Sequence, residues 1–501
     1  MATEWTQRTV VELAEAVRGG QVQAQAVAQE HLARIRERDP HLRAFIHVDP
    51  DTVLEAARSI DLRRERGESL GPLAGVPVAI KDSLCTRDAP TTCASRILQG
   101  RGGPWRPPYD ATVVERLRAA DALLVGKTNL DEFAMGSSTE NSAWGPTVNP
   151  WDPGRVPGGS SGGSAVAVAS RMAPAALGSD TGGSIRQPAS LTHVVGIKPT
   201  YGRVSRYGLV AFASSLDQVG PLATDVRGAA RVLGVIAGRD VRDATSAGVA
   251  VEDFEAACGG EVAGMRVGVP EEYFGEGLDD AVRERVREAL EGLRSAGCTL
   301  HPVSLPHTRY AIATYYVVAT AEASSNLARF DGVRFGSRVV PARGDLDGMY
   351  AATRGAGFGP EVKRRIMLGT YVLSAGYYDA YYLKAQRVRT LLRRDFELAF
   401  SQVDAIATPT SPTTAWKLGE RTSNPLAMYL ADAYTLPASL AGLPAIAVPC
   451  VPAPPCSDRP SLPVGLQLIG PSFGEASLCR LASAWERINP SAHAAPPGLV
   501  S

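Results

Sequence analysis

The stretch GGSSGGS at residues 158–164 is followed by SDTGGSIR at residues 179–186, and both come after VPVAI at residues 76–80, which leads into Lys81. The apolar run before Lys81 is typical of a buried strand, whereas the other two stretches are typical of glycine-rich turns. No histidine lies in any of the three. Because a serine hydroxyl is a weak nucleophile until a neighbouring base takes its proton, the three stretches indicate a serine hydrolase whose base is a lysine.

Lys81 fits the role of that base. A lysine accepts a proton only where burial favours its neutral amine, and Lys81 directly follows an apolar run. The chain has only six lysines among its 52 lysines and arginines, so a general preference for lysine over arginine does not explain a lysine at this position. Arginine could not replace it, since the guanidinium group stays protonated. The alternative interpretation of Lys81 is a solvated strand end.

The residues before Ser184 have the features of an acyl-transfer site. Glycines let the backbone approach a substrate and turn several N–H groups toward one point, as a developing oxyanion requires. Thr181, Gly182 and Gly183 are the candidate donors. Ser184 also forms a Ser-x-x-Gln pattern with Gln187, which is typical of a helix N-terminus. Alone, Ser184 could be only a helix cap, but the three stretches together favour a catalytic site.

These motifs resemble the amidase signature family. The resemblance implies a catalytic triad of two serines and a lysine. Ser184 would be the nucleophile that forms the acyl intermediate, Ser160 the bridging serine, and Lys81 the base. It also implies that a cis peptide bond joins Gly159 to Ser160.

The same resemblance implies the fold. We expect an α/β fold with a single large amidase-signature domain, residues 1–501, although the length alone would suggest two or three units. A central mixed, mostly parallel sheet would be covered by helices on both faces. The catalytic core would span about residues 70–225, after N-terminal helices at 1–69, and residues 226–501 would complete the domain with elements of the substrate pocket. The alternation of helical and strand patterns along the chain agrees with this class.

Downstream motifs narrow the resemblance to one branch of the family. EASSNLARFDG at 322–332, GYYDAYY at 376–382 and GRVSRYG at 202–208 are similar to the A subunits of the bacterial glutamyl-tRNA(Gln)/aspartyl-tRNA(Asn) amidotransferases. The likeness extends over nearly the whole chain. It implies a glutaminase half-reaction, in which glutamine acylates Ser184, ammonia leaves, and water releases glutamate.

Partners and cofactors also follow from this resemblance. Ammonia would pass to a B subunit that binds tRNA and ATP and amidates misacylated Glu-tRNA(Gln), Asp-tRNA(Asn) or both. A small C subunit would complete a heterotrimer. ATP and Mg²⁺ are expected at the B subunit, and this chain is expected to bind no cofactor and no metal. The net charge of zero gives no sign of a nucleic-acid surface, so tRNA would be bound through the complex.

The glutamine pocket needs two opposite charges, because free glutamine is a zwitterion. The resemblance implies that Arg365 binds the carboxylate, Asp432 the ammonium group, and Tyr315 a further part of the substrate. Arg364 and Tyr316 are the alternatives for the arginine and the tyrosine. An arginine on such a helix often forms only a surface ion pair with a glutamate one turn away.

Two other classes of function remain open. A free-standing amidase acting on small aliphatic or aryl amides would share the triad, and a non-catalytic scaffold would keep only the fold. The seven scattered cysteines show no Cys-x-x-Cys spacing, which is typical of reduced thiols without a metal site. The N-terminus lacks a signal pattern and no apolar run is long enough to span a membrane, so we expect a cytoplasmic enzyme without a membrane partner.

Overall fold

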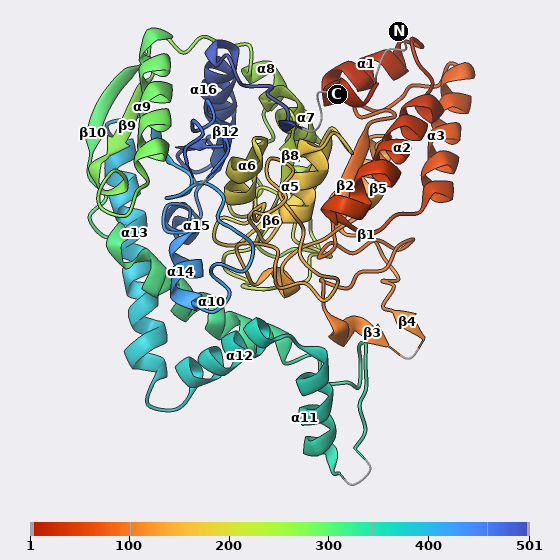
Figure 1. Ribbon diagram of the computed structural model, residues 1–501, viewed down its shortest axis with the longest axis vertical. Coiled ribbons are helices and arrows are strands. Elements are labelled where there is room, and N and C mark those ends of the chain that lie inside the picture. Colours follow the sequence, from red (N-terminus) through yellow and green to blue (C-terminus); the bar gives the residue numbers. More distant parts are fainter. Residues whose placement is uncertain (1–4, 101, 342–343, 458, 498–501) are drawn as a thin grey trace.

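Eleven strands form one central sheet in the order β1-β5-β2-β6-β8-β7-β12-β13-β11-β9-β10. In Figure 1 this sheet extends across the molecule from β1 on the right to β10 on the left. The structure is a computed structural model that describes residues 5–100, 102–341, 344–457 and 459–497. The ends of the expected 1–501 domain, residues 1–4 and 498–501, lie outside the described residues. The strands are β1 Phe45–His47, β2 Pro77–Lys81, β5 Leu123–Thr128, β6 Ala175–Asp180, β7 Val195–Lys198, β8 Gln218–Ala223, β9 Arg266–Pro270, β10 Thr299–Val303, β11 Ala405–Pro409, β12 Ala445–Pro449 and β13 Gly465–Ile469, with a separate ribbon of β3 Gln99–Gly100 and β4 Gly103–Pro104.

Helices flank this sheet and complete a single large α/β domain. They are α1 Val10–Arg18, α2 Ala24–Leu42, α3 Pro50–Glu65, α4 Thr112–Ala119, α5 Gly162–Ala169, α6 Arg186–Thr192, α7 Val226–Ile236, α8 Phe254–Ala257, α9 Asp280–Ser295, α10 Ala311–Leu327, α11 Leu346–Gly357, α12 Pro360–Leu373, α13 Lys384–Phe400, α14 Pro425–Leu430, α15 Leu436–Ala441 and α16 Glu475–Ile488. Shorter turns of 3-10 helix are η1 Trp5–Gln7, η2 Arg96–Leu98, η3 Glu132–Ala134, η4 Glu271–Tyr273 and η5 Thr308–Tyr310, and η6 Tyr378–Leu383 is π-helical.

Local sequence signals explain where the first helices begin. Thr9 and Glu12 form a capping box at the start of α1, in which each side chain accepts a hydrogen bond from the other residue's backbone N–H. Asp49 caps α3 by accepting from the N–H of Thr52, and Pro50 occupies the first turn, where its missing N–H costs nothing. Each such cap contributes about 1 kcal/mol to helix stability.

The sheet is mixed, as the sequence predicts. Parallel pairs join β5 to β2, β2 to β6, β11 to β9 and β9 to β10. The run from β6 through β8, β7, β12 and β13 to β11 is antiparallel, as is the pair of β1 and β5. Residues 199–217, and the described part of 450–464, contain no helix, and neighbouring strands joined without a helical crossover run antiparallel. The parallel share is therefore smaller than the alternation of helices and strands predicted.

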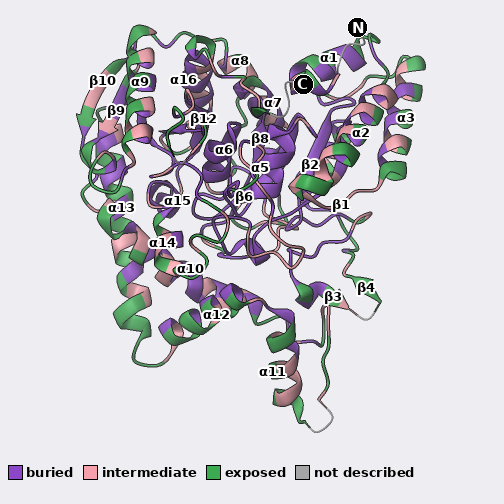
Figure 2. Ribbon diagram, in the orientation of Figure 1, coloured by how far each residue is buried: buried purple, intermediate pink, exposed green. Residues whose placement is uncertain are grey.

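Two parallel strands bring the candidate site together. β2 and β6 are buried along their whole lengths, which explains their apolar sequences. In their register Ile80 is paired with Leu177, so Lys81 and Asp180 both end their strands at the same edge of the sheet. Figure 2 shows that the buried residues are concentrated in this part of the sheet and in α5 and α6, whereas α13 carries long exposed faces. The carboxyl edge of β2 and β6 is where a ligand site is expected in such a sheet.

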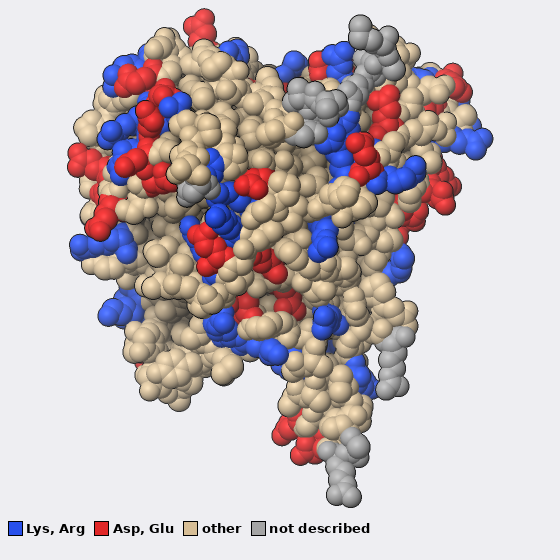
Figure 3. All heavy atoms as spheres, in the orientation of Figure 1, with Lys and Arg blue, Asp and Glu red and all other residues tan. Residues whose placement is uncertain are grey.

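The surface shows charges of both signs. On the face drawn in Figure 3, basic and acidic side chains are interspersed, in keeping with the net charge of zero. In the described part of the chain, no helix has both the length and the apolar character needed to cross a membrane.

Candidate active site

Hydroxyl groups surround the amine of Lys81 at the end of β2. Its Nζ donates to Oγ of Ser160 and to Oγ of Ser161, at 2.8 Å in each case. It also lies 3.0 Å from the hydroxyl of Ser179 on β6. Lys81 and Ser160 are both fully buried. The structure therefore brings the predicted base into direct contact with the predicted bridging serine.

Burial enables Lys81 to act as a base at neutral pH. Desolvation lowers the pKa of Lys81 from 10.5 to about 7, although the carboxylates of Asp131, Asp180 and Asp217 oppose this shift. The neutral amine is then well populated near pH 7, and a base whose pKa lies near the working pH is the most effective. A solvated strand end, the alternative interpretation of Lys81, does not fit these contacts.

The peptide bond between Gly159 and Ser160 is cis, the conformation that the family resemblance implied. The backbone here is packed so closely that a Cβ on Gly159 would lie 2.2 Å from Oδ2 of Asp131. The N–H of Gly159 donates to Oε1 of Gln187 at 2.9 Å. Gln187, for which the sequence predicted only a capping role, therefore bonds this peptide, and Asp131, to which the sequence analysis gave no role, packs against it.

Asp131 arranges the loop that packs against the cis peptide. Its carboxylate accepts the backbone N–H groups of Ser138, Thr139 and Asn141, at 3.2, 2.8 and 3.2 Å. Burial raises the pKa of Asp131 to about 6, and these three hydrogen bonds oppose that rise. The sequence signal was an acidic residue ahead of a serine-rich loop, which sequence alone does not distinguish from a surface turn.

Ser184 lies on the turn between β6 and α6. Its carbonyl accepts from the N–H of Ser161 at 3.1 Å, so this turn lies against the turn that carries Ser160. Ser184 keeps 7% of its surface exposed, whereas Ser160 keeps none, which suits a nucleophile that must reach substrate. The predicted capping box of Ser184 with Gln187 is wrong, because Ile185 is the cap residue of α6 and no side chain caps it. The side chain of Gln187 is instead bound to Gly159.

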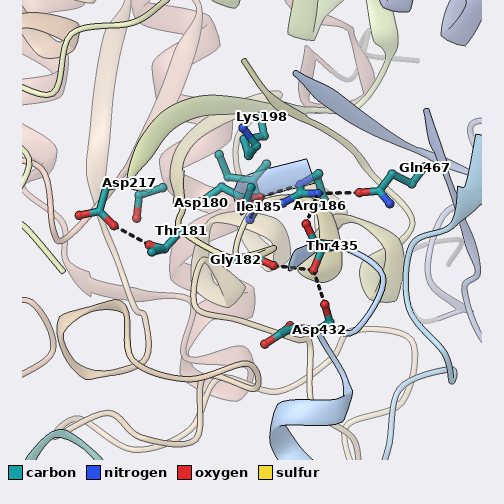
Figure 4. Close-up of polar contacts among 12 residues, drawn as sticks. Asp180, Thr181, Gly182, Ile185, Arg186, Lys198, Asp217, Asp432, Thr435 and Gln467 are labelled. Carbon is teal, nitrogen blue, oxygen red and sulfur yellow. Dashed lines mark hydrogen bonds and ion pairs between the residues drawn. The ribbon is translucent and has the colours of Figure 1, made fainter. Parts of the chain in front are cut away.

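The candidate oxyanion donors lie between β6 and Ser184. Within the part of the chain that the structure describes, the backbone N–H groups of Thr181, Gly182 and Gly183 have no hydrogen-bond acceptor. The Thr181 side chain points away from this turn and donates to Asp217 at 2.7 Å (Figure 4). Gly183 has a φ of +149°, and a Cβ there would lie 2.2 Å from Oγ1 of Thr435. Three unused amides in one tight turn can stabilise a developing oxyanion.

A buried ion pair anchors this turn to the C-terminal half of the chain. Arg186 donates from Nε and Nη2 to the carboxylate of Asp180 at 3.0 and 2.9 Å. Its Nη1 donates to the Thr435 carbonyl at 2.9 Å and to Oε1 of Gln467 at 2.6 Å (Figure 4). Sequence reasoning assigned a role to neither Asp180 nor Arg186; the only signal was a pair of opposite charges within a glycine-rich run.

Replacing Arg186 by leucine should lower the free energy of unfolding by about 3–5 kcal/mol, because it leaves the carboxylate of Asp180 buried without its partner. The measurement is chemical denaturation. Arg294→Leu is the matched control, since it removes an arginine from an ion pair with Glu291 in which both side chains are more than half exposed. Such surface pairs contribute about 0–1 kcal/mol. Equal losses in the two variants would contradict the anchoring role of Arg186.

The two candidate arginines of α12 differ in how far they are buried. Arg365 is 3% exposed, and its Nε donates to Glu361 at 2.8 Å. Its guanidinium group lies 5.3 Å from the ring of Tyr316 and 5.4 Å from that of Tyr429. The side chain of Arg364 is 43% exposed and bonds the other oxygen of Glu361. Only Arg365 is therefore placed inside the molecule.

Asp432 supplies a buried carboxylate close to Arg365. It is 7% exposed, and its Oδ2 accepts a hydrogen bond from the hydroxyl of Ser137. Burial raises the pKa of Asp432 to about 7, and the hydrogen bond from Ser137 and the charge of Arg365 oppose this. Thr435 links it to the oxyanion turn, because its Oγ1 contacts both the Asp432 carbonyl, at 3.1 Å, and the Gly182 carbonyl, at 2.6 Å (Figure 4).

The two candidate tyrosines lie between these charges and the oxyanion turn. A Cβ on Gly182 would lie 2.8 Å from Cζ of Tyr315, so this ring packs against the turn before Ser184. Tyr316 stacks on Tyr429 at 3.8 Å and faces Arg365. Tyr315 is buried and Tyr316 is partly buried, and desolvation raises the pKa of both hydroxyls and keeps them protonated. The arrangement as a whole can attack an acyl carbon of a ligand that carries one positive and one negative charge.

The chain is similar to several known proteins over nearly its whole length. Residues 26–479 match the family described as Amidase. The A subunit of the glutamyl-tRNA(Gln) amidotransferase of Chloroflexus aurantiacus is 57% identical over 499 residues, which cover 99% of this chain and 100% of that protein. The crystal structure of the protein of the same name from Thermotoga maritima has a TM-score of 0.79 at 46% identity, with 98% and 96% of the two chains covered. The peptide amidase of Stenotrophomonas maltophilia has a TM-score of 0.79 at 32% identity, with 98% and 99% covered.

Proposed function

The chain belongs to the amidase family, and we propose that this enzyme hydrolyses glutamine and supplies the ammonia to a tRNA-dependent amidotransferase. The single observation that carries the proposal is the buried pair of opposite charges, Arg365 and Asp432, next to the Ser184 turn. Arg365 is paired with Glu361 through its Nε, and the described residues offer no acceptor to its other two nitrogens, so a ligand of opposite charge can still bind there. Glutamine offers a carboxylate to Arg365 and an ammonium group to Asp432.

The proposed reaction begins with proton transfer from Ser184 through Ser160 to the neutral amine of Lys81. Oγ of Ser184 attacks the side-chain carbonyl carbon of glutamine, and the resulting oxyanion is stabilised by the backbone N–H groups before Ser184. The C–N bond breaks, and the proton returns from Lys81 through Ser160 to the leaving nitrogen, which departs as ammonia. Water then attacks the acyl carbon and gives a proton to the same relay. The bond from this carbon to Oγ of Ser184 breaks, the relay returns the proton to that oxygen, and glutamate is released.

Substrate binding would also set the protonation of Asp432. Without a ligand, burial holds the pKa of Asp432 near 7, so that a substantial fraction of the carboxyl groups is neutral. An ammonium group placed against this carboxylate favours its charged form and lowers its pKa. The binding of glutamine is therefore expected to weaken as the pH falls below about 7.

We extend the proposal to the complex. The relatives are named as A subunits, which implies an assembly of several subunits. A B subunit would use ATP and Mg²⁺ to amidate Glu-tRNA(Gln), Asp-tRNA(Asn) or both with this ammonia, and a small C subunit would complete the assembly. None of the seven cysteines, all of which lie among the described residues, forms a disulfide, which is in keeping with the proposed work in the reducing cytoplasm.

The alternative is a free-standing amidase for small aliphatic or aryl amides. It would use the same triad, and the peptide amidase noted above shares the fold. A neutral amide, however, would offer no carboxylate to Arg365 beyond its existing partner Glu361, and no ammonium group to Asp432. The pocket therefore favours glutamine.

Replacing Arg365 by leucine tests the choice between these functions. Hydrogen bonds to charged groups contribute about 1.5–3 kcal/mol, so the KM for L-glutamine should rise about 10- to 150-fold. The kcat should change much less, because Arg365 binds a part of the substrate that does not react. Arg364→Leu is the matched control, which removes an exposed arginine that bonds the same Glu361, and its KM should stay within about twofold of the wild type.

The same assay includes propionamide as a substrate without charges. An unchanged glutamine KM in Arg365→Leu would show that the pocket is assigned wrongly. A wild-type enzyme that hydrolyses propionamide and leaves glutamine intact would establish the free-standing amidase instead.

A further inference from the structure

A chain of hydrogen bonds joins the cis peptide to the proposed ammonium site. The N–H of Gly159 donates to Oε1 of Gln187 at 2.9 Å, and Nε2 of Gln187 donates to the carbonyl of Ser137 at 2.9 Å. The hydroxyl of Ser137 then donates to Oδ2 of Asp432. Gln187 is fully buried and Ser137 is 2% exposed. One amide side chain thus connects the turn that carries Ser160 to the loop that holds Asp432.

The backbone of Gln187 belongs to the other serine turn. Its N–H donates to the carbonyl of Gly183 at 2.8 Å, three residues after which α6 begins. The side chain has little room to move, because a Cβ on Gly158 would lie 2.4 Å from Oε1 of Gln187. Gln187 therefore touches both turns of the candidate active site without facing the substrate itself.

We propose that Gln187 is a positioning residue that fixes the Gly159–Ser160 peptide relative to Asp432. Its Oε1 holds the N–H directly before Ser160, and its Nε2 holds the backbone of Ser137. The position of the proton relay and the position of the substrate ammonium group then depend on the same side chain. The link to Asp432 rests on the proposed function, whereas the hold on Gly159 concerns the triad alone.

Loss of the hydrogen bonds of Gln187 is expected to slow the reaction of the folded enzyme. Without the Oε1 acceptor the peptide before Ser160 can shift, and a displacement of about 1 Å in a catalytic group costs on the order of 100-fold in rate. Loss of the bridge should therefore reduce the rate at which Ser184 is acylated. A bridge that is only structural would reduce stability and leave the rate of the folded enzyme unchanged.

Gln218 on β8 is a matched control for that structural effect. It is also fully buried, and its side chain also joins two backbone groups: Oε1 accepts from the N–H of Gly202 at 2.8 Å, and Nε2 donates to the carbonyl of Val204 at 2.9 Å. Replacement of either glutamine by methionine keeps the length of the side chain and removes both hydrogen bonds. The two variants should lose similar stability.

The experiment measures covalent labelling of Ser184 by a fluorophosphonate probe in the full chain, purified with whatever partner chains accompany it. Gln187→Met should be labelled about 10- to 100-fold more slowly than the wild type, and Gln218→Met, corrected for its folded fraction, within about twofold. Equal labelling rates for Gln187→Met and Gln218→Met would overturn the positioning role. Because the probe replaces glutamine, this readout does not depend on the proposed function.

Gln187→Glu tests the second half of the bridge and serves if the methionine variant does not fold. A carboxylate can still accept from Gly159 but cannot donate to Ser137, so labelling should stay within about fivefold while the KM for L-glutamine rises more than that. An unchanged KM would overturn the link to Asp432. If the wild type does not hydrolyse glutamine but the labelling rates follow the expected order, the glutaminase function fails and the hold of Gln187 on Gly159 stands.

Discussion

Glutamine hydrolysis is expected to fall by at least about 10,000-fold when Ser184 is replaced by alanine, because no other group can form the acyl intermediate. Removal of a nucleophile leaves only the rate acceleration that the oxyanion donors and substrate binding provide. The measurement is glutamate release under saturating L-glutamine. The KM, if residual activity allows its measurement, should change little, since Ser184 acts on the transition state.

Ser190→Ala is the control for this variant. Ser190 is also buried and lies on α6, six residues after Ser184, so its loss tests the effect of removing a hydroxyl group from the same helix region. Its activity should stay within about twofold of the wild type. A Ser184→Ala enzyme that keeps more than about 1% of wild-type activity would remove Ser184 from the role of nucleophile.

Replacing Lys81 by methionine should lower kcat by about 1,000-fold or more, because it removes the base while keeping an unbranched side chain in the buried site.

The pH profile of the wild-type enzyme gives a second test of this base. Burial lowers the pKa of Lys81 to about 7 and raises that of Asp432 to about 7, and both groups must be deprotonated to act. The kcat/KM for glutamine should therefore fall as the pH drops below 7. At the acid end it should fall about 100-fold per pH unit, because each of the two groups contributes a factor of ten.

The two titrations can be separated with a substrate that does not use Asp432. For propionamide, only Lys81 should matter, and kcat/KM should fall about tenfold per pH unit. Lys198→Met is the control for a buried lysine, since burial also lowers the pKa of Lys198 to about 7 and its Nζ bonds the Pro199 carbonyl at 3.1 Å. The pH midpoint should be the same in this variant as in the wild type. A midpoint that moves with Lys198 instead of Lys81 would contradict the assignment of the base.

The sequence alone indicated that Lys81 lies at the end of a buried strand, whereas the proposed roles of Ser160 and Ser184 came from the family resemblance. Lys81 follows an apolar run that is the buried strand β2, and the parallel pairing of β2 with β6 brings it to the turn before Ser184. The choice between Arg364 and Arg365 could not be made from sequence, because both residues can pair with Glu361. Only the packing of α12 shows which one is buried.

The supporting residues could not be predicted because their partners are distant in sequence. Gln187 bonds a backbone N–H 28 residues away, and Arg186 bonds Gln467, 281 residues away. The local pattern therefore gave a wrong prediction. Ser184 and Gln187 have the spacing of a capping box, but the side chain of Gln187 bonds Gly159 and does not cap the helix. The antiparallel middle of the sheet was missed for a similar reason, since pairing partners such as β7 and β12 are far apart in the chain.

The role of Ser184 as the nucleophile is tested by identifying the acylated residue during turnover. The enzyme is mixed with isotopically labelled L-glutamine, stopped in acid within the first turnovers, and digested for peptide mass spectrometry. If Ser184 is the nucleophile, Ser184 of the wild type carries a labelled glutamyl group, attached through the side-chain carbonyl carbon of glutamine, and Ser184→Ala carries none. A glutamyl group on another residue, or continued hydrolysis of glutamine by an enzyme without Ser184, would contradict this role.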